Sequence, residues 1–468
     1  MIIEQIYTGC LAQGAYYIES NGEVAIIDPL REVQEYIDKA EKSNSNIKYI
    51  FETHFHADFV SGHVTLAEKK GAKIVFGPTA ATNFEAIIAE DNQVFKVGGI
   101  TITVLHTPGH TMESSCYLLK DENGKDHALF SGDTLFLGDV GRPDLAQKGE
   151  VTEEDLAGFL FDSLRNKVMP LADDVIVYPA HGAGSACGKN LSKDTVGTMG
   201  NQKETNYALR ATMTKEEFIK EVTDGLLPPP AYFPFNVKLN KEGYQDIDNV
   251  IENSAKPLSV EAFEIHANET NALVLDVRHQ SEFIKGFIPQ SIFIGLGGTF
   301  APWVGALIKD IKQPILLVTP EGEEKGTIIR LSRVGFDNVI GYLDGSFDAW
   351  KNANKEIDTL ESISAEVLEE KSKENPPIFD VRKPGEYGSE HMENVTNTPL
   401  DYLNEHISEF PKNKAFYVHC AAGYRSVITA SILKARGFHN VIDVAGGYTA
   451  IKKTRIKTTS PVCPTTLT

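Results

Sequence analysis

One internal repeat constrains the fold of this chain more than any other feature of its sequence. The segment LVLDVRHQSEF at 273–283 returns as PIFDVRKPGEY at 377–387, and VGFDNVIGYLDGSFDAW at 334–350 returns as RGFHNVIDVAGGYTAI at 436–451. Each copy spans about 100 residues and alternates apolar runs with amphipathic stretches, the pattern of alternating strands and helices. The repeat therefore predicts two similar α/β domains with parallel sheets.

Length, charge and cysteine content limit what else the chain is. Its 468 residues suggest about three domains, so one further domain precedes the repeat. The formal charge of −20 disfavours nucleic acid and anionic membranes as partners. No apolar run is long enough to span a bilayer, and the first 20 residues lack the features of a secretory signal. Five widely spread cysteines do not form a disulfide framework, so we expect a cytoplasmic protein.

Potential metal ligands cluster in the part of the chain before the repeat. Each follows an apolar run that predicts a strand, so the strand ends can bring these side chains into one crevice. The motifs are HFHAD, HTPGHT, SGDT and PAHG, and they contain His54, His56, Asp58, His110, Asp133 and His181. Imidazole and carboxylate groups in this order predict a metal site.

These motifs resemble the metallo-β-lactamase superfamily over residues 1–245. The resemblance implies an αββα sandwich with the metal at one edge. The hydrolases of the superfamily usually carry HxHxDH and hold two zinc ions. In that arrangement Asp133 bridges two sites, made by His54, His56 and His110 and by Asp58, the next histidine and His181. Here Phe59 replaces that next histidine, and a phenyl ring has no lone pair for a metal.

The missing histidine favours a mononuclear centre. The pattern resembles the persulfide dioxygenases, a branch of the superfamily related to glyoxalase II. This resemblance implies one Fe(II) per chain, bound by His54, His110 and Asp133. Two imidazoles and one carboxylate form the facial triad of non-haem iron oxygenases. The resemblance leaves a set of residues to orient those ligands, namely His56, Asp58, His181 and Asp28.

Two interpretations of this region stay open. In the first alternative, a dinuclear zinc centre tolerates Phe59 and the chain is a thiolester hydrolase of the glyoxalase II type. The second open interpretation concerns the role of Arg142 in GRPD. Its guanidinium suits a carboxylate on the thiol that carries the persulfide, but an arginine that braces a loop fits the sequence equally well.

The second copy of the repeat carries a candidate nucleophile, Cys420. In FYVHCAAGYRS the cysteine directly follows a strand and precedes a glycine-containing loop and a helix, a setting that stabilises a thiolate. Residues 363–459 resemble a rhodanese domain, which implies that Cys420 carries sulfane sulfur as a persulfide, with Arg425 and Asp380 in the same site. Related phosphatases have five residues between cysteine and arginine, whereas this loop has only Ala421–Tyr424. Phosphatase activity is therefore the lesser alternative.

The first copy, at 257–354, resembles the same fold without its nucleophile. Aligning the two loops places Thr319 at the cysteine position and Glu323 and Glu324 opposite Tyr424 and Arg425. A hydroxyl without an adjacent base is a poor sulfur carrier. We expect this copy to be catalytically silent and to orient its neighbours.

Together these features predict an enzyme that oxidises a low-molecular-weight persulfide, such as glutathione persulfide, with O2 to sulfite and thiol. Rhodanese transfer would then connect persulfide, sulfite and thiosulfate. A non-catalytic persulfide sensor is a further alternative. The sequence leaves open the thiol carrier, the net direction of transfer, the role of Cys187 and whether the chain forms a homo-oligomer.

Overall fold

The computed structural model describes residues 1–145 and 151–462. These residues divide into two compact units. The first is Met1–Ile247 together with Ser332–Gly335, and the second comprises Asp248–Leu331 and Phe336–Thr468. Among the described residues, no helix is long and apolar enough to cross a membrane.

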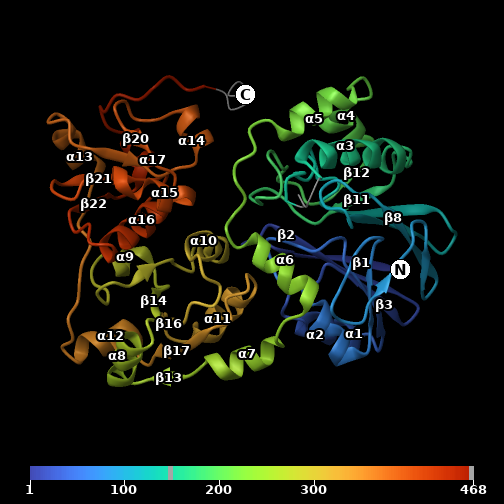
Figure 1. Ribbon diagram of the computed structural model, residues 1–468, viewed down its shortest axis with the longest axis horizontal. Helices are drawn as coiled ribbons and strands as arrows, with labels where there is room; N and C mark the ends of the chain where they lie inside the picture. The colour runs from blue at the N-terminus through green and yellow to red at the C-terminus, as the bar shows by residue number, and fades with distance from the viewer. Residues whose placement is uncertain (146–150, 463–468) are drawn as a thin grey trace. The chain divides into compact units, whose positions relative to one another are not determined.

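The first unit contains two six-stranded sheets (Figure 1). The first sheet has the order β1-β2-β3-β4-β5-β6 and the second the order β12-β11-β10-β9-β8-β7. The strands are β1 (Ile2–Thr8), β2 (Gln13–Ser20), β3 (Glu23–Ile27), β4 (Asn46–Phe51), β5 (Lys73–Phe76), β6 (Ile87–Ile88), β7 (Val94–Val97), β8 (Ile100–His106), β9 (Ser115–Lys120), β10 (Asp126–Gly132), β11 (Ile176–Pro179) and β12 (Gly197–Thr198).

Helices cover the outer faces of both sheets, which gives four layers. Three apolar clusters fill the spaces between the layers, and the middle one, with Phe51, Tyr117 and Phe130, lies between the sheets. The αββα sandwich predicted from the sequence is confirmed. The helices are α1 (Gln34–Lys42), α2 (His63–Lys70), α3 (Glu153–Ser163), α4 (Met199–Thr205), α5 (Lys215–Thr223), α6 (Phe233–Glu242) and α7 (Ile247–Ser254), the last of which continues into the second unit.

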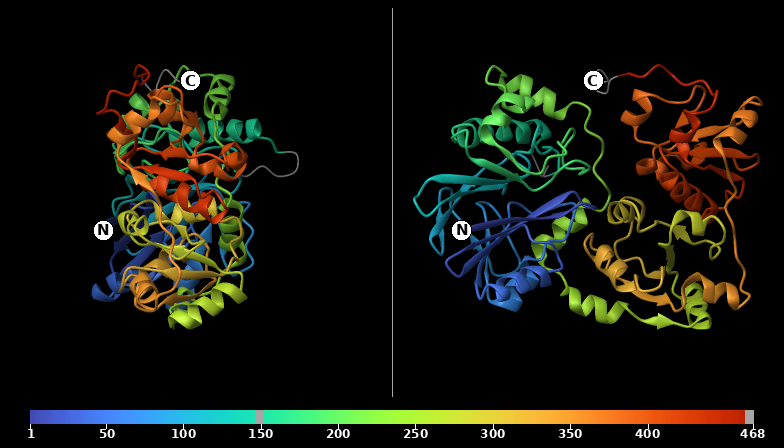
Figure 2. Two further views of the ribbon diagram at one scale, coloured as in Figure 1. Left: turned by 90° about the vertical axis from the view of Figure 1, so that its left-hand side faces the viewer. Right: turned by 180° about the vertical axis from the view of Figure 1, so that it is seen from behind.

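The second unit holds the two copies of the repeat, each built on a five-stranded parallel sheet (Figure 2). The orders are β13-β17-β16-β14-β15 and β18-β22-β21-β19-β20, so the copies share one topology. The strands are β13 (Pro257–Leu258), β14 (Leu273–Asp276), β15 (Ile292–Phe293), β16 (Ile315–Val318), β17 (Val339–Leu343), β18 (Ser362–Ile363), β19 (Ile378–Asp380), β20 (Thr396–Asn397), β21 (Phe416–His419) and β22 (Val441–Val444).

Short helices connect these strands, as parallel pairing requires. The residue that follows the central strand is Thr319 in the first copy and Cys420 in the second, which agrees with the sequence alignment. The helices are α8 (Val260–Glu269), α9 (Gln280–Phe283), α10 (Phe300–Leu307), α11 (Glu324–Ser332), α12 (Ser346–Asn352), α13 (Ala365–Ser372), α14 (Pro384–Ser389), α15 (Leu403–His406), α16 (Tyr424–Ala435) and α17 (Gly447–Ile451).

The core of the first copy offers a direct test of this packing. Leu316 on β16 is fully buried in the cluster that includes Trp350. Both tryptophans of the chain, Trp303 and Trp350, lie in this copy, so their fluorescence reports its unfolding. We expect Leu316→Ala to lower the free energy of unfolding by about 2–5 kcal/mol, because it leaves a cavity. The matched control Ile265→Ala, at a position 53% exposed, should change it by less than about 0.5 kcal/mol.

Candidate functional site

The predicted metal ligands come together at one edge of the sandwich in the first unit. His54 lies in the loop after β4, His110 in the loop between β8 and β9, and Asp133 directly after β10. Their ligand atoms all lie within 4.8 Å of one another, and all three side chains are buried. The Oδ2 atom of Asp133 is 3.4 Å from Nε2 of His110 and 3.8 Å from Nε2 of His54.

The chemistry of this cluster fits a cation. Both carboxylate oxygens of Asp133 are buried and accept no hydrogen bond within the described structure. A buried carboxylate without partners is costly unless an ion or a proton compensates it. Burial and the neighbouring imidazoles hold the pKa of His54 well below its ordinary value, so its ring stays neutral and keeps a lone pair. Two imidazoles and one carboxylate are thus available to a metal.

Hydrogen bonds behind the cluster orient the two rings. Nδ1 of His54 lies 3.0 Å from the hydroxyl of Thr53, which in turn donates to Asp28. Nδ1 of His110 lies 2.8 Å from the backbone carbonyl of Arg142. Each ring therefore presents Nε2 to Asp133, because a partner at Nδ1 fixes the ring orientation.

The side chain of His56 points into a different environment. Its Nε2 is 3.1 Å from Oδ1 of Asp28 and 3.6 Å from Oε2 of Glu52, the distances of an ion pair. Burial acts to lower the pKa of His56, but the Asp28 carboxylate outweighs it and the pKa rises to about 9. A protonated imidazole has no free lone pair, so this pairing competes with metal binding. The ring of Phe59, fully buried, packs on His56 with centroids 4.4 Å apart.

A second group of ligand atoms lies beside the first. Nε2 of His181 is 3.6 Å from Asp58 and 3.5 Å from Asp133, and His56, Asp58 and His181 also lie within 4.8 Å of one another. Burial raises the pKa of the Asp58 carboxyl. The structure thus brings together all the residues of the predicted metal region, and their division between ligands and supporting residues stays a prediction.

The guanidinium of Arg142 already has partners. It forms a bidentate ion pair with Asp144, with two N–O distances of 2.6 Å, and donates to the carbonyls of Ala186 and Leu227. Arg142 is only 6% exposed. This geometry favours the loop-bracing alternative, in which Arg142 holds the loop whose carbonyl orients His110.

Cys187 lies close to the cluster, with Sγ within 4.8 Å of ligand atoms of Asp133 and His181. Burial first, and then Asp58 and Asp133, raise the pKa of its thiol well above the ordinary value. A thiol in this state is a poor nucleophile.

The loop around Cys420 in the second unit has the geometry expected of an anion cradle. The backbone N–H of Gly423, whose φ of +100° suits glycine, donates to Sγ of Cys420 at 3.1 Å. The loop then enters the 12-residue helix α16, whose N-terminus favours negative charge. Beneath the sulfur, the thiol contacts the Ser426 hydroxyl at 3.6 Å, and Ser426 donates to the buried Asp443.

Arg425 and Asp380 both form ion pairs within their own domain. Arg425 makes a bidentate pair with Glu386, at 2.5 and 2.8 Å. Asp380 makes one with Arg382, and Asp276 and Arg278 repeat that pair in the copy without a cysteine. Because the Asp–Arg pair is present in both copies, we interpret it as structural.

Three residues that contact this loop or its arginine are not predicted by the sequence motifs. Glu386, Ser426 and Asp443 lie in or near the repeated segments, but nothing in their spacing shows that they contact Arg425 or Cys420. The repeat does pair Glu386 with Glu282, which marked the position as shared by both copies.

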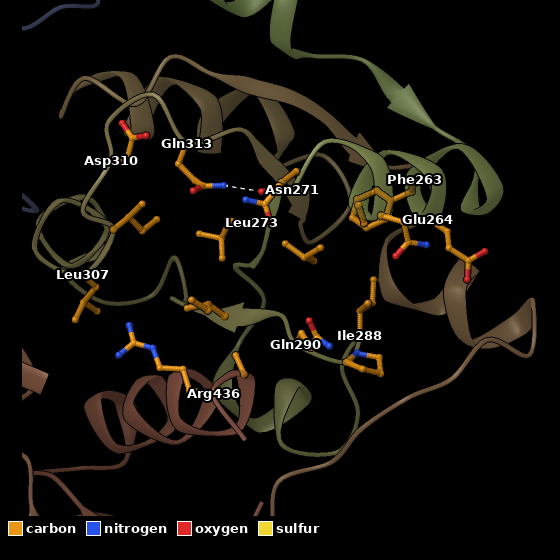
Figure 3. A pocket seen from close by; sticks show the side chains of 18 of the residues that line it. Phe263, Glu264, Asn271, Leu273, Ile288, Gln290, Leu307, Asp310, Gln313 and Arg436 are labelled. Atoms are coloured by element: carbon orange, nitrogen blue, oxygen red, sulfur yellow. Dashed lines mark hydrogen bonds between the residues drawn. The ribbon is translucent and has the colours of Figure 1, made fainter. Parts of the chain in front are cut away.

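A cavity of about 690 Å³ lies within the second unit, apart from these residues (Figure 3). Phe263 and Glu264 of α8 line it on one side and Leu307 and Arg436 on the other. None of the predicted site residues lines it.

Comparisons with known proteins agree with this architecture. The sequence matches the metallo-beta-lactamase superfamily over residues 8–181 and the rhodanese-like domain over 259–353 and 364–454. The crystal structure of a metallo-beta-lactamase from Staphylococcus aureus subsp. aureus COL is 31% identical, with a TM-score of 0.64. The match covers 73% of this chain and 98% of that one.

Named relatives are similar to the N-terminal part. Hydroxyacylglutathione hydrolase GloC of Haemophilus influenzae is 30% identical over 186 residues, which cover 35% of this chain and 82% of that protein. The probable hydroxyacylglutathione hydrolase glo2 of Schizosaccharomyces pombe is 32% identical over 161 residues, or 34% of this chain. The chain spans 58% of the length of that relative.

Gly141 gives a test of the cluster that changes no ligand residue. A Cβ atom there would lie 2.0 Å from the Asp133 carbonyl oxygen and 2.9 Å from Nδ1 of His110. We expect Gly141→Ala to weaken metal affinity about 10–100-fold, measured by competition with a chelator, because both groups must shift. Gly9→Ala is the control, since a Cβ there meets no atom within 4 Å, and equal affinity in both variants would contradict this role for the cluster.

Proposed function

Since the chain belongs to the metallo-β-lactamase superfamily and carries two rhodanese-like domains, we propose that it is an iron-dependent persulfide dioxygenase fused to a sulfurtransferase. The first reaction is R–S–SH + O2 + H2O → R–SH + sulfite, with release of two protons. The second moves sulfane sulfur at Cys420 between persulfide, sulfite and thiosulfate. The observation that carries the proposal is the triad His54, His110 and Asp133 beside a phenylalanine where dinuclear relatives place a histidine.

The residues divide between holding the metal and keeping its surroundings in place. His54, His110 and Asp133 would hold one Fe(II) and leave positions open, as a facial triad does. When bound, the iron supplies a site at which O2 and the persulfide sulfur meet and exchange electrons. The ion pair of His56 with Asp28 and the apolar ring of Phe59 support a single metal rather than two.

Further imidazole and carboxylate groups lie next to the triad. Nε2 of His181 lies between the carboxylates of Asp58 and Asp133, at 3.6 and 3.5 Å. Arg142 contributes through its backbone carbonyl, which orients His110, while its guanidinium braces the loop.

Sulfur transfer follows from the thiolate of Cys420. The thiolate attacks the outer sulfur of R–S–SH, the inner S–S bond breaks, and the thiol R–SH leaves with the proton. Sulfite then attacks the sulfur carried by Cys420, which gives thiosulfate and restores the thiolate. The N–H of Gly423 and the start of α16 stabilise the negative charge at each stage.

A thiolester hydrolase of the glyoxalase II type is the second candidate. The names of the relatives GloC and glo2 favour it for the N-terminal part. Phe59 and the fused rhodanese-like domains favour the persulfide reaction, because a hydrolase has no use for a sulfur carrier.

Oxygen uptake with glutathione persulfide tests the proposal. We expect protein purified without oxygen to hold one iron per chain and to consume one O2 for each sulfite formed. His110→Ala should lose the metal and the oxygen uptake together, because it removes one of three ligands. Two zinc ions per chain, with hydrolysis of a glutathione thiolester and no oxygen uptake, would support the hydrolase instead.

Replacement of the nucleophile separates the two reactions. We expect Cys420→Ser to keep oxygen uptake with added persulfide. Its rate of thiosulfate formation should fall by at least about 1000-fold, because removal of a catalytic nucleophile lowers kcat by that order or more. Cys10→Ser, which changes a cysteine in the first unit, serves as the control and should keep both reactions. Sulfur transfer that persists in Cys420→Ser would contradict the assignment.

A further inference from the structure

The two copies of the repeat contact each other next to the cysteine loop. Helix α16, which begins where that loop ends, packs against β15 of the copy without a cysteine. The backbone N–H of Phe293 on β15 donates to the Ser431 hydroxyl of α16 at 2.9 Å. The silent copy therefore lies against the helix whose N-terminus faces Cys420.

Tyr424 joins the cysteine loop to the silent copy. It follows Gly423, which donates to Sγ of Cys420, and it precedes Arg425. Its hydroxyl donates to the carbonyl of Gly295 in the silent copy at 2.7 Å. Its ring meets the ring of Phe293 edge to face, with centroids 6.0 Å apart and planes inclined by 72°. Burial raises the pKa of the phenol, so the hydroxyl stays a donor.

Gly298 of the silent copy makes room for the Tyr424 ring. A Cβ atom on Gly298 would lie 2.5 Å from Cζ and 2.6 Å from Cε1 of Tyr424. Neither distance is compatible with contact between carbon atoms, so only glycine at 298 admits the ring where it lies. Around its neighbour Gly297, no atom of the residues that the structure describes lies within 4 Å of the equivalent Cβ position.

The opposite side of the loop is held by its own domain. The N–H groups of Tyr448 and Thr449 donate to the carbonyls of Cys420 and Ala421, at 2.7 and 3.0 Å. These bonds fix the start of the loop, and Tyr424 fixes its end. A donor such as the Gly423 N–H stabilises a sulfur anion only while the loop keeps its geometry.

We propose that the copy without a cysteine positions the Cys420 loop, and that Tyr424, seated over Gly298 and bonded to Gly295, is the positioning residue that connects them. This inference rests on the proposed sulfur transfer at Cys420. It gives the silent copy a role in the reaction of its neighbour, although its own loop carries Thr319.

Gly298→Ala tests the inference from the silent copy, with Gly297→Ala as its matched control. We expect Gly298→Ala to lower kcat for thiosulfate formation about 10–100-fold, the effect of a displacement of about 1 Å at a reactive group. It should also slow alkylation of Cys420 at neutral pH, because the N–H donors no longer stabilise the thiolate. Gly297→Ala should match the wild type in both measurements, and oxygen uptake should stay unchanged in both variants.

Tyr424→Phe provides a second variant that keeps the ring and removes only the hydrogen bond to Gly295. We expect a smaller fall in kcat, with KM for the persulfide unchanged.

Wild-type transfer and alkylation rates in both Gly298→Ala and Tyr424→Phe would overturn the inference while the proposed function stands. Wild-type protein that forms no thiosulfate would instead contradict the proposed function. Circular dichroism reports whether each variant folds; if Gly298→Ala does not fold, the result for Tyr424→Phe decides.

Discussion

The uncompensated carboxylate of Asp133 is the constraint on which the first unit depends. Both of its oxygens are buried and accept no hydrogen bond from the described residues, and imidazoles approach it from three other loops. Four layers of secondary structure bring those loops to one edge, so the sandwich concentrates negative charge that only a cation or a proton relieves. The ion pair of His56 with Asp28 then limits how many ligands are free to bind that cation.

In the second unit, backbone groups instead of a metal stabilise a buried negative charge. Cys420 lies where a strand ends and α16 begins, and the Gly423 N–H points at its sulfur. Neighbouring charges are paired off, Arg425 with Glu386 and Arg382 with Asp380. The cradle therefore relies on short-range hydrogen bonds, which depend on loop geometry more than a long-range charge does.

Much of this arrangement was predictable because the sequence carries it locally. The repeat predicts the two parallel-sheet domains. The positions of His54, His110 and Asp133 after apolar runs predict the cluster, because β8 and β10 lie on either side of the antiparallel strand β9 and therefore end at the same edge of their sheet. The contacts of Arg142 with Leu227, of Glu386 with Arg425 and of Tyr424 with Gly295 were not predictable, because these partners lie far away in the chain or on another domain. A single sequence records the type of each residue but not its contacts. Arg142 was therefore equally consistent with binding a substrate carboxylate and with bracing a loop.

The packing of α16 on β15 has a consequence for the independence of the two copies. β15 ends its sheet, and a sheet edge with unpaired backbone groups invites pairing with other chains. In the second unit, Ser431 accepts the N–H of Phe293 and the helix covers that edge. Excision of the second copy would uncover this strand, so α16 protects the silent domain against aggregation while that domain supports the loop before α16.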